Sequence, residues 1–500
     1  MSLVGDEVQE APVGDEVQEA PVGDGLQGTL VGDGLRATES AEHSLMPVPE
    51  SVRTSTVAHQ FWIWSGANVA PINWVLGALG IGLGLSLAQT IAVLIIGNLI
   101  GMLTFGFFVL MGQRTAVSQM VLSRSAFGRR GAYFPALLQG LLAVGWCAIN
   151  TWIILDLVIA LIAKLGYHGG TGLKILVAVV IMALQIWLAA VGFRAIARFE
   201  RWTVPVTLVV LAAMTVVAWT HSGVVWGYKG SGLHGRELWS ALSTLMTAIG
   251  IGWGITWFAY ASDYSRFVSR SVPARKLYFG SVLGQFIPTV WLGIFGATLG
   301  TISQTVDPGQ LVVQAFGALA IPVILLVIHG PIATNVLNIY SAGLAAQTLD
   351  WKIDRRKLSY GVGVLALAFT IFLVLDGKFA SALDGWLGGL VTWVAPWAAI
   401  MLIHFYWVKK RSVDVPALFE PPGHGRLGDV SWPAMIAFVL GIIATWSFEY
   451  AVPTWLQGPG AIALGGIDLS WLAGSAVAAV VYVAGLAVSG NRSPAKVAIT

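Results

Sequence analysis

The sequence is poor in charged residues, which fill 11% of its 500 positions, whereas hydrophobic residues fill 56%. A soluble domain usually carries about 25% charged residues, so this composition excludes an ordinary soluble protein. The formal net charge is only +3, and no polar segment combines clustered Lys and Arg with aromatic residues. A nucleic-acid-binding protein needs such a basic patch. We therefore expect no nucleic-acid partner and a chain that lies in a lipid bilayer.

Cysteine is nearly absent, because Cys147 is the only one. A single cysteine forms neither an intrachain disulfide nor a metal site by itself. The sequence also lacks a Walker A phosphate loop and any His, Cys and Asp cluster with metal-ligand spacing. These absences exclude an ATP-driven pump, and they leave a membrane-embedded enzyme without a nucleophile–base pair or metal ligands. We expect neither catalysis nor a cofactor, so an ion gradient supplies the energy or the transport is passive.

Long apolar runs recur from His59 onward, each long enough to cross about 30 Å of hydrocarbon as a helix. A β-barrel would show short alternating segments instead. We predict an all-α polytopic membrane protein with about twelve transmembrane helices. The run 311–348 is too long for one span, so a short interfacial helix is expected before a span near Ile321. The expected spans are 59–83, 85–112, 132–162, 172–193, 202–220, 239–262, 277–301, 311–348, 358–376, 379–408, 432–452 and 467–489.

Residues 1–58 differ from the rest of the chain. The sequence VGDEVQEAP occurs twice in tandem, from Val4 and from Val13, and two diverged copies follow. This acidic, Gly-rich repeat has no aromatic residue and cannot bury enough apolar surface to fold. We therefore expect a disordered tail over 1–58, a transporter domain over 59–489 and a short cytoplasmic tail over 490–500.

Lys and Arg gather in alternate loops. The loops after even-numbered spans carry most of them, and the opposite loops carry few. Cytoplasmic loops are enriched in these residues, so we expect both termini and the even loops in the cytoplasm of a multi-pass protein in the cell (inner) membrane. The cations of the even loops are Arg114, Arg124, Arg129, Arg130, Arg194, Arg198, Arg201, Arg266, Arg270, Arg275, Lys276, Lys352, Arg355, Arg356, Lys357, Lys409, Lys410, Arg411 and Arg426.

Several tryptophans lie near the predicted span ends, where membrane proteins carry a belt of aromatic residues. We expect their side chains at the membrane interface. They are Trp62, Trp64, Trp202, Trp226, Trp239 and Trp432.

Two spans contain residues that interrupt helices. The first span contains GANVAP at 66–71, and the sixth contains GIGWG at 250–254. The two lie at the first position of successive blocks of five spans. Interrupted helices at matching positions of two halves indicate a transporter binding site, because the opened backbone offers donors and carbonyls. The alternative is that Gly and Pro are simply common in membrane helices.

The third span places Trp146 and Asn150 on one helix face, four residues apart and near mid-membrane. An indole face and an amide together suit a flat heterocycle with donors and acceptors on its edge. The eighth span places Asn335 and Asn338 on one face, beside the hydroxyl of Thr334. A hard cation such as Na⁺ prefers oxygen ligands of this kind. The alternative for all these amides is hydrogen bonding between helices.

With these residues in view, the chain resembles nucleobase:cation symporter family 1, the purine–cytosine permease and allantoin or hydantoin transporter group. The resemblance runs from about Pro47 to the twelfth span and leaves the tail outside. The segments that carry it are FWIWSGANVAPINW at 61–74, SRSAFGRRGAYFPALLQGLLAVGWCAINTW at 123–152, WFAYASDYSRF from Trp257 and NVLNIYSAGL from Asn335.

The resemblance implies a LeuT-like fold of two inverted five-span repeats, 59–220 and 239–408, with two extra helices at 432–489. It also implies alternating access around a central site. In the family, aromatic side chains of the third and sixth spans sandwich the substrate. Trp146 matches the first of these, and Trp253 or its alternative Trp257 matches the second.

The resemblance also implies which polar groups meet the ligands. The substrate edge would be read by amides, and Gly254 belongs to the opened sixth span. The cation would bind the carbonyls of Trp64 and Ala67 and the hydroxyl of Thr334. Ala333 stands where some relatives have Ser, which leaves H⁺ open beside Na⁺. The amides that match substrate-facing positions are Asn68, Asn150, Asn335 and Asn338.

We therefore expect a secondary active importer of a nucleobase or related ring, working as a monomer and coupled to H⁺ or Na⁺. One alternative is a carrier of the same fold for an amino acid or a vitamin. A carboxylated substrate would want a cationic partner, and no Lys or Arg lies at mid-membrane. A second alternative is a channel, which should show a continuous polar stripe or a charged ring.

Overall fold

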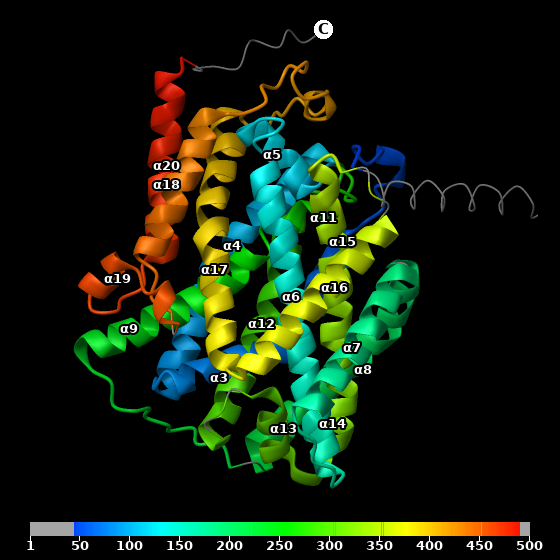
Figure 1. The fold of residues 1–500 in the computed structure, drawn as a ribbon, viewed down its shortest axis with the longest axis vertical. Coiled ribbons are helices and arrows are strands. Elements are labelled where there is room, and N and C mark those ends of the chain that lie inside the picture. Colours follow the sequence, from blue (N-terminus) through cyan, green and yellow to red (C-terminus); the bar gives the residue numbers. More distant parts are fainter. Residues whose placement is uncertain are drawn as a thin grey trace, which may run out of the picture.

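The computed structural model describes residues 45–490 except 192, 222, 304, 306, 352, 354 and 452. For some helical residues, among them 189–204 and 249–253, it describes the backbone alone. Most of the expected N-terminal tail, 1–44, and the C-terminal residues 491–500 thus lie outside the described residues. The described part is helical, with isolated β-bridges but no named strand (Figure 1).

The first five spans follow the predicted order. After the short η1 (Glu50–Val52), the first span consists of two helices, and a short helix, α5, lies between the second and third spans. The elements are α2 (Val57–Asn68), α3 (Pro71–Gly82), α4 (Leu87–Thr115), α5 (Gln119–Phe127), α6 (Tyr133–Lys164), α7 (Thr171–Val191) and α8 (Phe193–His221).

The next five spans run from α9 to the π-helical η4. The expected interfacial helix is α13, and the span after it begins at α14, next to Ile321. The elements are α9 (Gly235–Leu245), η2 (Met246–Ile251), α10 (Gly252–Thr256), α11 (Ala261–Ser265), α12 (Ala274–Ser303), α13 (Pro308–Phe316), η3 (Gly317–Leu319), α14 (Ala320–Val327), α15 (His329–Thr348), α16 (Arg355–Asp376), α17 (Phe379–Leu402) and η4 (Ile403–Val408).

Two further spans complete the bundle. They pack against each other and against α17, along one side of the molecule (Figure 1). The elements are η5 (Pro416–Phe419), α18 (Trp432–Ser447), η6 (Thr454–Leu456), α19 (Pro459–Ala463) and α20 (Ser470–Val488). Among the described residues, 7 helices are long and apolar enough to cross a membrane, and shorter apolar helices complete other spans. The prediction of an all-α polytopic protein with about twelve spans is confirmed.

The first span breaks where the sequence predicts. The helix α2 ends at Asn68, and Ala70 has an extended backbone with φ −140° and ψ 149°. Pro71 then occupies the first turn of α3. Proline lacks the N–H that a helix interior requires, but the first turn leaves that group unbonded anyway. The chain therefore stops one helix and starts another at this point.

The sixth span breaks later than predicted. Residues 250–254 are helical, first in the π-helical η2 and then in α10, and the chain leaves the helix at 257–260. Gly254 instead permits close packing, because a Cβ built on it would lie 2.6 Å from the Cα of Gly101 in α4. The prediction of a break at 250–254 is wrong, and Gly254 serves a helix contact instead.

The helix α12 packs along α2, α3 and α4. It approaches α3 closely at Gly77, where an added Cβ would lie 1.9 Å from the carbonyl oxygen of Gly293. Small residues at such contacts let membrane helices approach closely. This packing holds both halves of the broken first span against one continuous helix.

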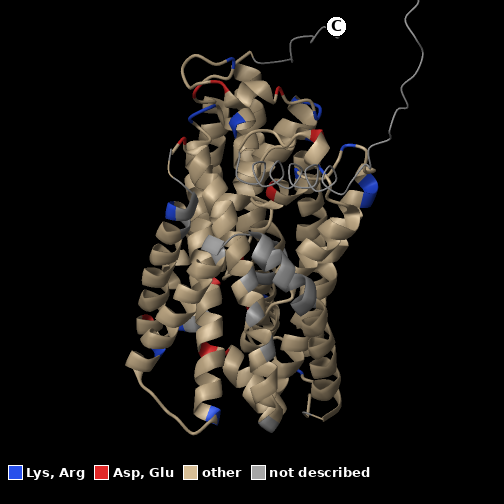
Figure 2. Ribbon diagram, turned by 90° about the vertical axis from the view of Figure 1, so that its right-hand side faces the viewer, with Lys and Arg blue, Asp and Glu red and all other residues tan. Residues whose placement is uncertain are grey.

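Lys and Arg residues lie mainly at one end of the bundle, here named the arginine-rich end (Figure 2). Trp62, Trp226, Trp239 and Trp432 are exposed, as expected for an interfacial belt, and the side chain of Trp202 is outside the described ones. Trp64 is fully buried, so its assignment to the belt is wrong. A position near the end of a span does not fix the face on which a side chain lies, and Trp64 faces the bundle.

Candidate functional site

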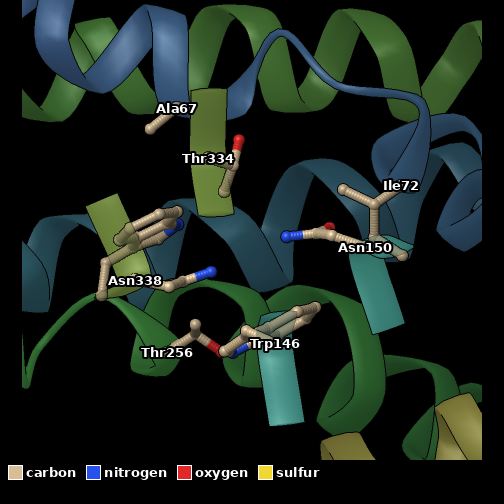
Figure 3. A pocket seen from close by; sticks show the side chains of 8 residues that line it. Ala67, Ile72, Trp146, Asn150, Thr256, Thr334 and Asn338 are labelled. Atoms are coloured by element: carbon tan, nitrogen blue, oxygen red, sulfur yellow. The ribbon is translucent and has the colours of Figure 1, made fainter. Parts of the chain in front are cut away.

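A small cavity lies beside the break in the first span. Figure 3 shows the amides of Asn150 and Asn338 pointing toward the middle of this cavity, with Trp146 and Thr256 on the same side of it. The cavity has room for about one water molecule, so the site is closed in this structure. It is lined by Ala67, Ile72, Trp146, Asn150, Thr256, Trp257, Thr334 and Asn338.

The helix α6 supplies the aromatic and one amide of the cavity. Trp146 and Asn150 are one turn apart, and both are buried. The spacing of four residues places them on one face, as the sequence predicts. The helix α15 supplies Thr334 and Asn338 by the same spacing from the opposite side.

Asn335 lies behind the cavity and connects its two amides. Its Oδ1 accepts a hydrogen bond from Asn150 Nδ2 at 2.9 Å and a longer one from Asn338 Nδ2 at 3.5 Å. Its Nδ2 donates to the carbonyl of Cys147 at 3.1 Å and to Gln185 Oε1 at 3.0 Å. Asn335 therefore positions Asn150 and Asn338 rather than lining the cavity itself.

Gln185 of α7 is a partner that the sequence analysis missed. It is fully buried, and its Oε1 accepts hydrogen bonds from Asn335 and from Thr151 Oγ1, the latter at 3.0 Å. Its sequence signal is a lone amide in an otherwise apolar helix. Ile72 and Thr256 also line the cavity, and these residue types are too common in membrane helices to be singled out from sequence.

Trp257 is the sixth-span aromatic that lines the cavity. The Trp64 ring lies against it with a centroid distance of 5.6 Å, and Trp64 also contacts Phe105 at 4.7 Å and Tyr264 at 5.4 Å, all edge-on. These four rings form an aromatic floor between the cavity and the arginine-rich end. The side chain of Trp253, the other candidate, lies outside the described ones.

Asn68 is not among the residues that line the cavity. Its Nδ2 donates to the carbonyl of Trp64 at 2.8 Å, within its own helix. Asn73 donates in turn to the carbonyl of Asn68. The structure thus does not bring Asn68 among the lining residues, and it gives the Trp64 carbonyl a donor already.

Ala67 and Thr334 meet at the cavity from α2 and α15. The hydroxyl of Thr334 donates to the carbonyl of Gly330 at 3.1 Å. A hydroxyl that donates still offers oxygen lone pairs. Residues of the first and eighth spans thus line the cavity side by side with Thr334 as an oxygen donor, whereas Gly254 faces α4.

Hydrogen bonds close the bundle below the aromatic floor. Gln60 Nε2 donates to the carbonyl of Tyr264 at 3.2 Å, and Trp64 Nε1 donates to Gln60 Oε1 at 3.3 Å. Arg53 donates to the carbonyls of Gln113 and Val268 and so ties the segment before α2 to two other spans. The arginine-rich end is therefore closed.

Asp350, which follows α15, connects several helices at the arginine-rich end. It accepts hydrogen bonds from Arg129 at 2.8 Å and from the Tyr133 hydroxyl, and Arg124 lies at 3.4 Å. Partial burial by itself raises the pKa of Asp350. The hydrogen bonds from Arg129 and Tyr133 outweigh this effect and hold the pKa of Asp350 below its ordinary value. Burial lowers the pKa of Arg124 to about 10. This cluster links α5, α6 and α15.

A protein-family model described as a permease for cytosine/purines, uracil, thiamine and allantoin matches residues 47–474. A Bacillus subtilis protein named as a purine-cytosine permease is 26% identical over 446 residues, which cover 87% of this chain and 93% of that protein. A purine-uracil permease of Arabidopsis thaliana is 25% identical, covering 80% of this chain and 70% of its own length.

Solved structures share the fold at low sequence identity. Mhp1, a nucleobase-cation-symport-1 family transporter solved in a closed conformation with bromovinylhydantoin bound, superposes with a TM-score of 0.72 at 18% identity, covering 90% of this chain and 96% of that one. A manganese transporter of Eremococcus coleocola superposes with a TM-score of 0.55 at 12% identity, covering 89% and 98%. The fold alone therefore does not select a substrate.

Proposed function

The chain belongs to nucleobase:cation symporter family 1, the family of permeases for cytosine, purines, uracil, thiamine and allantoin, and on this premise we propose that it imports a nucleobase or a related planar ring. The candidates are cytosine, a purine, allantoin and a hydantoin. Import is coupled to a cation and proceeds by alternating access in a LeuT-like fold. The repeats extend over 59–220 and 239–408.

The observation that carries this proposal is the closed cavity in which an indole and two amides converge beside a broken helix. Trp146 and Trp257 stack on the ring, while Asn150 and Asn338 bond its edge. Trp253 stays the alternative stacking partner. Amide donors and acceptors match the N–H and C=O groups of a nucleobase, and stacking suits any flat ring.

Three other predicted residues act indirectly in this proposal. Asn335 orients the two amides of the cavity. Asn68 stabilises the end of α2 through the Trp64 carbonyl. Gly254 lets the sixth span lie against α4. Each therefore shapes the site without contacting the ring.

The coupling cation binds near Ala67 and Thr334, with the Trp64 carbonyl one turn away. It is Na⁺ or H⁺, and it favours the state that is ready for substrate. The cation shifts this equilibrium only by its differential affinity for the two states. The absence of a hydroxyl at Ala333 is consistent with either ion.

The arginine-rich end faces the cytoplasm in this proposal, because cytoplasmic loops are enriched in Lys and Arg. Both termini then lie on the cytoplasmic side of the cell (inner) membrane. The protein works as a monomer. The asymmetry of charge along the bundle supports this orientation (Figure 2).

The test is uptake by purified protein in proteoliposomes. Labelled cytosine, adenine, uracil, allantoin and a hydantoin are offered separately under an imposed Na⁺ gradient, an imposed pH gradient, and neither. We expect saturable uptake of at least one ring, stimulated by one gradient, with counterflow. Uptake that does not saturate indicates a channel, and transport of amino acids or vitamins but of none of these rings rejects the proposed substrate class.

A further inference from the structure

A second set of polar side chains lies below the cavity, toward the arginine-rich end. Gln139 of α6 is on the same face as Trp146, since seven residues make about two turns and a rise of about 10 Å. Tyr260 follows α10 in the break of the sixth span. Both side chains are fully buried within the bundle.

Outside this pair, neither side chain has a hydrogen-bonding partner in the part of the chain that the structure describes. This holds for both amide atoms of Gln139 and for the hydroxyl of Tyr260. The Gln139 amide and the Tyr260 hydroxyl interact only with each other, through a contact that falls short of full hydrogen-bond geometry. Buried polar groups are nearly always bonded, because an unbonded one costs free energy. A buried amide that carries this free-energy cost indicates a ligand that enters the protein and supplies the missing hydrogen bonds.

This pair is continuous with the cavity. The ring of Tyr260 lies edge-on against Trp257, with a centroid distance of 5.5 Å, and Trp257 lines the cavity. The indole N–H of Trp257 is also buried without an acceptor among the described residues. Unbonded donors and acceptors therefore run from the cavity through Trp257 to Tyr260 and Gln139.

We propose that Gln139 and Tyr260 form an inner subsite for the same class of planar heterocycle, which holds the ring after it leaves the cavity toward the cytoplasm. This inference rests on the proposed function and orientation. The Gln139 amide supplies one donor and one acceptor to the ring edge, and the Tyr260 hydroxyl supplies either. In the closed structure both side chains are buried, and opening of the arginine-rich end exposes them.

The test measures thermal stability and compares transport from the two faces of the membrane. The variants are Gln139→Leu and Tyr260→Phe, and Gln185→Leu is the matched control because the Oε1 of Gln185 accepts two hydrogen bonds. Apolar replacement of an unbonded buried amide is neutral or stabilising, whereas loss of a bonded one is destabilising. We therefore expect Gln139→Leu to melt at the wild-type temperature or above it, and Gln185→Leu to melt below it.

Transport is measured from each face, in right-side-out and inside-out vesicles. Loss of one hydrogen bond at the inner subsite raises the KM for a cytoplasmic ring about tenfold. The KM from the outer face stays within about twofold, since the outer route meets the cavity first. Tyr260→Phe shows the same asymmetry because it removes only the hydroxyl.

Two results overturn the subsite while leaving the proposed function intact. One is a Gln139→Leu protein with wild-type KM values on both faces. The other is a Gln139→Leu protein that melts as low as Gln185→Leu and loses affinity equally on both faces, which is the behaviour of a structural residue. A wild-type protein that transports none of the rings rejects the proposed function and the subsite together.

Discussion

Asn150 donates a hydrogen bond of 2.9 Å to Asn335 across the contact between α6 and α15. The amide that faces the cavity is thus held by an amide behind it, and that second amide is held by Gln185 and the Cys147 carbonyl. Positioning of this kind lowers the entropy that a ligand loses on binding. The contact links two spans that belong to different halves of the transporter.

Asn335→Ala removes the group that orients Asn150. We expect the affinity for every transported ring to fall about tenfold, because an unheld amide must be ordered on binding. The buried partners lose their bonds, so stability falls by about 1–3 kcal/mol. Equilibrium binding and thermal unfolding measure the two effects. Unchanged affinity would show that Asn150 does not depend on this bond.

Trp146→Ala removes the stacking surface of α6. Base–aromatic stacking is worth about 1–3 kcal/mol per base, so we expect saturable uptake to disappear and Trp146→Phe to retain part of it. The control is Trp432→Ala, since Trp432 is exposed at the surface of the bundle. Wild-type uptake by the Trp146→Ala protein in vesicles rejects the site.

Thr334→Ala removes the side-chain oxygen proposed to bind the cation. We expect the concentration of the coupling cation that gives half-maximal uptake to rise about tenfold, with Thr334→Ser close to wild type. The measurement is uptake at a fixed ring concentration while Na⁺ or pH is varied. A cation dependence identical to that of the wild type places the cation elsewhere.

The lowered pKa of Asp350 predicts how its contribution to stability changes with pH. Its pKa is lower in the folded protein than in an unfolded chain, so its contribution to stability is present above about pH 4 and is lost as the pH falls through the folded value. We expect Asp350→Asn to melt below the wild type at pH 7 and this difference to shrink toward pH 3. A difference that stays constant over this range shows that the charge of Asp350 is not what stabilises the cluster.

Gly77→Ala tests the contact between α3 and α12. The new methyl group would lie 1.9 Å from the Gly293 carbonyl oxygen, so we expect overpacking to destabilise the protein by about 1–3 kcal/mol. Gly140→Ala is the matched control, because nothing lies within 4 Å of its added Cβ. Equal melting temperatures for the two variants contradict the close contact.

The sequence predicts the fold well, because length and hydropathy determine which segments cross a membrane. It locates the break at Pro71, since proline has one physical consequence at that position. It misplaces the break in the sixth span, because glycine opens a helix in one setting and packs helices closely in another. Gly254 packs its helix closely against α4, and only the position of α4 shows that it does this rather than open the helix.

The sequence predicts part of the candidate site, because helical spacing determines which residues share a face. Helical spacing brings Trp146 and Asn150 to one face and predicts that they share the cavity. It does not say which amides line the cavity and which bond elsewhere in the protein, so it does not separate Asn150 and Asn338 from Asn335 and Asn68. Gln139 and Gln185 are both amides in largely apolar helices, and sequence alone does not show how many hydrogen bonds each of them makes.

The position of Trp64 has a consequence for leakage. Its ring contacts Phe105, Trp257 and Tyr264, which belong to α4, the break in the sixth span and α11. Each aromatic pair contributes about 0.5–1.5 kcal/mol beyond burial, and tilting α2 separates all three at once. With the proposed orientation, we expect passage toward the cytoplasm to open in an all-or-none manner, so that a partly separated floor, which would let ions through without substrate, is sparsely populated.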